Sequence, residues 1–180
     1  MRNYFEKMKG TTKSPPRVAF SEVIWSWIGG FSGIGAVALL GNTLEVSRPD
    51  YLFLIGSFGS SAVLVYGAPD VPSAQPRSLV GGHVISATIG VAIYQVLPEP
   101  LFLSASLAVA TAIAIMHLTK TIHPPGGASA LIAVIGSSKI HDLGFSYVYS
   151  PVATGAGIML LVALIINNIP RNRRHPQFWL

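Results

Sequence analysis

The chain has 180 residues, of which 51% are hydrophobic and only 11% are charged, and its formal net charge is +5. So small a share of ionisable residues indicates a single membrane domain rather than a soluble one. Cysteine is absent, which excludes a disulfide framework, a thiolate metal site and a thiol nucleophile.

A basic leader, residues 1–17, precedes the first apolar run and carries five Lys or Arg residues. The apolar run that follows is longer than the core of a secretion signal, so we interpret it as a retained signal anchor. Trp25 and Trp27 lie just inside it, where aromatic side chains meet the membrane surface. The leader is therefore expected in the cytoplasm.

Six long windows contain no Asp, Glu, Lys or Arg. A helix that crosses the hydrocarbon needs about 20 residues, and four windows reach that length comfortably, whereas the second and fifth are short or broken. We expect an all-α polytopic membrane protein with six membrane helical elements. The windows are Val23–Leu44, Tyr51–Pro69, Ser78–Pro98, Pro100–Thr119, Thr121–Ser138 and Leu143–Pro170.

The distribution of basic residues favours six complete crossings. Both chain ends are basic, so the positive-inside rule puts both in the cytoplasm and requires an even number of crossings. Six crossings place ten Lys or Arg residues inside and two outside, Arg48 and Lys139. If windows two and five only dip in and return, the division becomes eight against four.

Windows two and five share a pattern of small residues. Residues 59–65 and 127–133 align with three identities, and each segment is the middle element of three. We therefore predict two inverted repeats, about 18–98 and about 99–170, followed by a cytoplasmic basic tail, 171–180. A broken helix at matching positions of inverted repeats is typical of a transport site near the membrane midplane.

The predicted site lies between two short helices that start at Ser60 and Ala128 with their N-terminal ends facing each other. Such ends attract anions, but they do so weakly, so nearby cations must contribute. Arg77, Lys120 and His123 are the candidates. The full set of candidate binding residues is Ser57, Gly59, Ser60, Ser61, Arg77, His83, Lys120, His123, Pro124, Pro125, Gly126, Gly127 and Ser129.

Several candidates have an ordinary structural alternative. His123 is expected to contact an anion or relay a proton; its structural alternative is to cap the helix that follows it or to bond a carbonyl freed by the prolines. Arg77 and Lys120 could be interfacial anchors whose stems reach the headgroups. His83 could be a neutral group that bonds a neighbouring helix.

Two blocks of the sequence resemble the HPP family of integral membrane proteins, which is named for its His-Pro-Pro. Residues 116–133 contain His123-Pro124-Pro125, and residues 56–64 with the later Gln75-Pro76-Arg77 and Gly81-Gly82-His83 are similar to the other characteristic region. Family members from chloroplasts and cyanobacteria are linked to nitrite transport, which the resemblance implies here. The family is usually described with four or five spans, whereas the charge windows predict six.

The leading expectation is a carrier or channel for a small inorganic anion, nitrite first, in the cell (inner) membrane. The alternatives are a pore for a small neutral or cationic solute and a membrane assembly or sensory module without transport. We expect a homo-oligomer, either a dimer or a trimer. No paired carboxylates, metal motif or cofactor motif occurs, so no enzyme, metal or cofactor is expected, and the basic termini suit lipid headgroups rather than nucleic acid.

Overall fold

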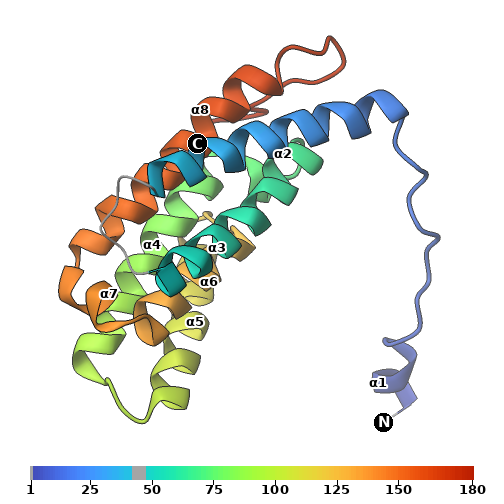
Figure 1. Cartoon of the computed structure of the whole chain (residues 1–180). Helices are drawn as coiled ribbons and strands as arrows, with labels where there is room; N and C mark the ends of the chain where they lie inside the picture. Colours follow the sequence, from blue (N-terminus) through green and yellow to red (C-terminus); the bar gives the residue numbers. More distant parts are fainter. Residues whose placement is uncertain (1, 42–47) are drawn as a thin grey trace.

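The computed structural model describes residues 2–41 and 48–180, and these residues form helices and no strand (Figure 1). The first window ends at Leu44, which lies outside the described residues. The elements are α1 (Arg2–Glu6), α2 (Phe20–Gly41), α3 (Arg48–Gly67), η1 (Pro72–Ala74), α4 (Pro76–Val96), α5 (Leu101–Leu118), α6 (Pro124–Ile135), α7 (Ser138–Leu143), η2 (Val148–Ala153) and α8 (Thr154–Ile166).

Prolines set the start of two central helices. Pro76 is the first residue of α4, and Pro124 and Pro125 open α6, positions where a missing N–H costs no helical hydrogen bond. The residue before α6, His123, has an extended backbone, with φ −139° and ψ 101°. The chain therefore stays unwound between the end of α5 and His123.

Four helices are long and apolar enough to cross a membrane: α2, α4, α5 and the kinked unit of η2 and α8. The apolar part of α3, Leu54–Gly67, and α6 are shorter. At 1.5 Å per residue the 12 residues of α6 extend about 18 Å, well below the hydrocarbon thickness of about 30 Å. The expectation of an all-helical membrane protein with a short fifth element is confirmed.

Contacts between element ends show that successive membrane helices alternate in direction. Arg77 at the start of α4 bonds the carbonyl of Thr119 after α5, at 2.7 Å. At the opposite end, Asp50 near the start of α3 accepts a bond from the N–H of Ser137 after α6, at 2.8 Å. We call the first of these the basic end, because Arg77, Lys120 and the C-terminal arginines lie there.

The sixth window does not form one uniform helix. Its first residues belong to α7 and a turn, and the backbone of Ser150 inside η2 is non-helical, with φ −136° and ψ 120°. Pro151 follows directly and has no N–H for a helical bond, so the helix is kinked there. The regular helix α8 begins only at Thr154.

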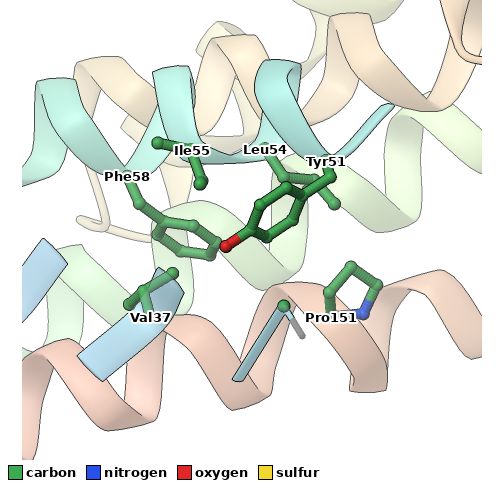
Figure 2. Close-up of a pocket in the computed structure, with 7 residues that line it drawn as sticks. Val37, Tyr51, Leu54, Ile55, Phe58 and Pro151 are labelled. Atoms are coloured by element: carbon green, nitrogen blue, oxygen red, sulfur yellow. The ribbon is translucent and has the colours of Figure 1, made fainter. Parts of the chain in front are cut away.

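Helix α3 packs through aromatic side chains onto α2 and η2. Figure 2 shows the rings of Tyr51 and Phe58 directed from α3 toward Val37 and Pro151. The gap that remains between them has a volume of about 10 Å³ and an apolar lining. That is at the lower limit for a single water molecule, so this gap is no candidate for an anion site.

Candidate functional site

A cluster of polar side chains is buried where α3, α4 and α6 meet. Its members are at most 1% exposed, although hydrophobic side chains dominate the surroundings. All were candidate binding residues from the sequence. We call them the His–Ser cluster: Ser57, Ser61, His83, His123 and Ser129.

Helical spacing and small residues bring the cluster together. Ser57 and Ser61 lie one turn apart on α3, so both face the same neighbours. Gly82 lets His123 approach α4, because a Cβ on Gly82 would lie only 2.5 Å from the Cβ of His123. The side chain of His83, also on α4, reaches Ser61 on α3 and Ser129 on α6.

Short hydrogen bonds connect the cluster members. The Ser61 hydroxyl lies 2.8 Å from His83 Nε2 and 2.8 Å from His123 Nε2. The hydroxyl of Ser129 lies 2.8 Å from His83 Nδ1 and 3.3 Å from the hydroxyl of Ser57. The cluster is therefore a continuous network.

Three further groups surround the network. His123 Nδ1 lies 2.7 Å from the carbonyl oxygen of Ser73 in η1. Ser57 donates to the carbonyl of Pro125 at 3.0 Å, and Tyr147 donates to the carbonyl of Ser129 at 3.1 Å. Sequence analysis missed Ser73 and Tyr147. Ser73 takes part through its main chain, which any residue has, so no side-chain pattern could single it out.

The predicted break in the second window is wrong. Helix α3 runs without interruption from Arg48 to Gly67, through Ser57 and Ser61. Glycine and serine weaken a helix by at most about 1 kcal/mol each, and no proline occurs there to remove a bond. Inside a membrane an unwound segment would leave backbone groups unpaired, which costs more, so the helix persists.

Of the two predicted helix N-termini, the one at Ser60 does not exist, and the other lies at Pro124 rather than at Ala128 and offers few free donors. Pro124 and Pro125 have no N–H, and the N–H of Gly126 already donates to the carbonyl of His123 at 2.8 Å. Ser57 on α3 contacts Pro125 and Ser129 on α6 directly, so no open hollow separates these side chains. In this conformation the polar groups of the cluster bind one another.

The other candidate residues lie outside the cluster. Arg77 bonds Thr119 at the end of α5, and the exposed Lys120 has a left-handed backbone, with φ 55°. Gly126 packs against Gly82. A Cβ added to Gly127 would lie 3.8 Å from the side chain of Val109. Pro125 is buried and touches the cluster through its carbonyl, which accepts from Ser57. The remaining candidates, Gly59, Ser60 and Pro124, are partly or fully exposed on α3 and α6.

Two surface hollows lie beside the cluster. The first has a volume of about 390 Å³ and is lined by Ser73, Ser78, His117, Lys120 and two apolar residues. The second has a volume of about 360 Å³ and is lined by Ser60, Leu64, Pro124, Pro125 and Ala128. Each hollow shares one residue with the surroundings of the cluster, Ser73 in the first and Pro125 in the second.

Among the residues that the structure describes, no group of three or more His, Asp or Glu side chains is arranged to hold a metal ion. Two histidines of the cluster converge on one hydroxyl, that of Ser61. Both ring nitrogens of His83 and both of His123 have a hydrogen-bond partner, so this geometry suits hydrogen bonding and proton transfer.

The chain matches the family model of the HPP transmembrane region over residues 15–176. It is also 49% and 41% identical to two proteins of Dictyostelium discoideum that are described only as transmembrane proteins. Each match covers 98% of this chain but only 57% and 63% of the relatives, so the chain spans less than two thirds of their length. No solved structure matches.

Proposed function

This chain belongs to the HPP transmembrane family, and from that premise we propose that it transports a small inorganic anion, nitrite first, across a cell membrane. The observation that carries the proposal is the buried His–Ser cluster at the meeting point of three membrane helices. Polar and ionisable residues at membrane depth are costly, and they mark substrate and proton pathways.

The cluster provides donors for an anion without a competing carboxylate. Three hydroxyls and two imidazole rings can each donate to nitrite oxygen atoms. Asp50 is the buried carboxylate of α3, and it bonds Ser137 at the far end of α6. The exposed Lys120 in the first hollow adds positive charge at the basic end, which would attract anions toward the cluster.

Transport requires α3 and α6 to separate. In the closed form, Ser57 is bound to Pro125 and Ser61 to His123. Parting the two helices would release these hydroxyls, and an anion between them would replace the lost bonds. Helix α6 packs more extensively against α4 than against α3, so a separation of α3 from α6 would leave most of the packing of α6 in place.

Uptake of nitrite by vesicles that contain the purified protein tests the proposal. We expect uptake that exceeds that of protein-free vesicles and that falls when His123→Ala or Arg77→Ala replaces the wild type. The matched control is Ser104→Ala, because Ser104 is a buried serine of α5 whose hydroxyl bonds Leu101 within its own helix. If the wild type moves no nitrite, the proposal of a nitrite transporter fails.

A small neutral solute is the second candidate, because the cluster side chains both donate and accept hydrogen bonds. Competition of labelled nitrite against neutral solutes and cations separates the two.

We further propose that both chain ends lie on the cytoplasmic side of a cell membrane, since the basic end carries Arg77, Lys120 and the C-terminal arginines. Homo-oligomer formation as a dimer or trimer is part of the same proposal.

A further inference from the structure

The hydrogen bonds of the His–Ser cluster have a single consistent direction. A carbonyl oxygen only accepts, so His123 Nδ1 must donate to Ser73. In the neutral ring Nε2 is then an acceptor, and the Ser61 hydroxyl donates to it at 2.8 Å. The oxygen of Ser61 is left to accept, so His83 Nε2 carries the hydrogen that bonds it.

The direction of the hydrogen bonds is also determined from His83 to the second turn of α6. With hydrogen on Nε2, His83 Nδ1 accepts from the Ser129 hydroxyl at 2.8 Å. The oxygen of Ser129 lies 3.3 Å from the Ser57 hydroxyl, whose hydrogen can also bond Pro125 at 3.0 Å. Rotation of the Ser57 hydroxyl from Pro125 to Ser129 completes an unbroken chain of donors and acceptors.

The chain extends from the basic end to the middle of the bundle. Ser73 lines the first hollow, of about 390 Å³. Ser57 is the tenth of the 20 residues of α3 and therefore lies near the middle of that helix. The five side chains of the His–Ser cluster are at most 1% exposed, so the path is shielded from bulk water.

We propose that Ser57, Ser129, His83, Ser61 and His123 form a proton pathway between the centre of the bundle and the hollow beside Ser73, and that it couples transport to protons. The coupling rests on the proposed function. Proton movement through the chain does not depend on nitrite being the substrate.

One proton enters and one leaves in each transfer. A proton from the bundle centre binds Ser57, which passes its own hydrogen to Ser129, and Ser129 passes its hydrogen to His83 Nδ1. His83 then releases the Nε2 hydrogen to Ser61, and Ser61 releases its hydrogen to His123 Nε2. The bond between His123 Nδ1 and the carbonyl of Ser73 must then open, so that a solvent water molecule from the hollow that Ser73 lines accepts the Nδ1 hydrogen.

All groups end neutral, with both rings in the opposite tautomer. The carbonyl of Ser73 then faces a nitrogen without hydrogen, which is unfavourable. Rotation of the rings and hydroxyl groups restores the starting form.

The titratable neighbours of the path are few in the part of the chain that the structure describes. Tyr147 lies on the α8 side and donates to the main chain of Ser129. Arg77 on α4, His117 in the last turn of α5 and Lys120 after α5 lie toward the basic end. Asp50 on α3 lies toward the opposite end. The path itself consists of hydroxyls and imidazoles.

Vesicles that contain the protein and an internal pH-sensitive dye test the proposal, with protein-free vesicles as the measure of passive leak. The wild type is expected to move protons together with nitrite. Ser61→Ala should lower the rate of proton movement by about tenfold, which corresponds to a barrier increase of about 1.4 kcal/mol, and should therefore lower the number of protons moved per nitrite. Ser61→Thr keeps the hydroxyl and should restore the ratio, and Ser104→Ala should leave it unchanged.

The outcomes separate this proposal from the proposed function. Nitrite uptake without proton movement overturns the pathway and leaves nitrite transport standing. Proton flux under a membrane potential without nitrite uptake supports the pathway and overturns nitrite transport. Absence of both fluxes in the wild type overturns both. If Ser61→Ala does not fold, Ser129→Ala interrupts the path at another point, and the wild-type measurement remains decisive.

Discussion

Gly126 of α6 packs against the main chain of Gly82 of α4, so that a Cβ on Gly126 would lie 2.7 Å from the carbonyl oxygen of Gly82. A backbone atom cannot move aside as a flexible side chain does. This contact brings the entry of α6 close to α4 and places His123 beside His83, with ring centroids 4.9 Å apart.

Gly126→Ala should therefore destabilise the protein by about 1–3 kcal/mol, the usual cost of overpacking. The neighbouring Gly127→Ala is the matched control, because its Cβ would lie 3.8 Å from Val109, in ordinary contact. Thermal unfolding of the purified proteins in detergent measures the difference in Tm. Equal Tm values for the two variants would contradict the close contact between α4 and α6.

Arg173 fastens the C-terminal segment to the bundle. Its guanidinium is almost completely buried and forms a salt bridge of 2.7 Å with Glu22 at the start of α2. It also donates to the carbonyls of Glu22 and Tyr66 and to the side chains of Ser26 and Asn167.

Arg173→Gln should lower the free energy of unfolding by about 3 kcal/mol, because it leaves the partners of a buried charge unpaired. The exposed Arg171 and Arg174 provide controls, and Arg174→Gln should change stability little. Detergent-based thermal unfolding compares the variants. The contrast also bears on the alternative of a membrane assembly module, in which the basic chain ends would recruit partners. Deleting the whole tail would remove the buried contacts of Arg173, whereas substitution of the exposed Arg171 and Arg174 changes surface charge.

His175 should make stability depend on pH. Burial lowers the pKa of His175 from its ordinary value of 6.5, against smaller opposite effects of the Pro69 carbonyl and Asp70. Its Nε2 is buried without a hydrogen-bond partner. The unfolded chain binds a proton below pH 6.5 more readily than the folded chain, so this contribution is fully present above that value and is lost as the pH falls below it.

His175→Gln should therefore reduce the decrease in Tm between neutral and mildly acidic pH. The comparison is made against wild type, so that the effects of the other histidines cancel. An unchanged decrease in the variant would show that His175 does not contribute to it.

Lys120 should draw anions to the first hollow. Its backbone is left-handed, with φ 55°, a conformation that asparagine tolerates well. Lys120→Asn therefore removes the charge with little effect on the fold, and the KM for nitrite should rise by up to about fivefold at low salt. Lys120→Arg should retain the wild-type KM. A KM in Lys120→Asn that is equal to wild type at low salt would argue against a role of this charge.

Much of the site was predictable from residue type. Ser57, Ser61, His123 and Ser129 were candidates because they lie at the two predicted helix breaks, and His83 because it lies in a charge-free window beside Gly81 and Gly82. The structure joins all five in one hydrogen-bond network. The geometry expected for them was wrong, since α3 is continuous and the proline pair removes donors from the start of α6. The inverted repeat stays a prediction.

Arg77 and Lys120 show where residue type was insufficient. Both were expected to contribute charge to the same site as His123, yet Arg77 bonds Thr119 and Lys120 lines a separate hollow. Long side chains reach several partners from one backbone position, so only the packing of the surrounding helices determines which partner they bind.

The sequence by itself determined that this protein is a bundle of membrane helices, because long windows without charge can satisfy their backbone groups in lipid only as helices. It also singled out five polar side chains, those of the His–Ser cluster, that the structure buries together. The tertiary structure alone decided how they pair, including the bond of His123 to the main chain of Ser73. Such pairing depends on the rotation and close approach of helices far apart in the chain, and local sequence does not encode these distances.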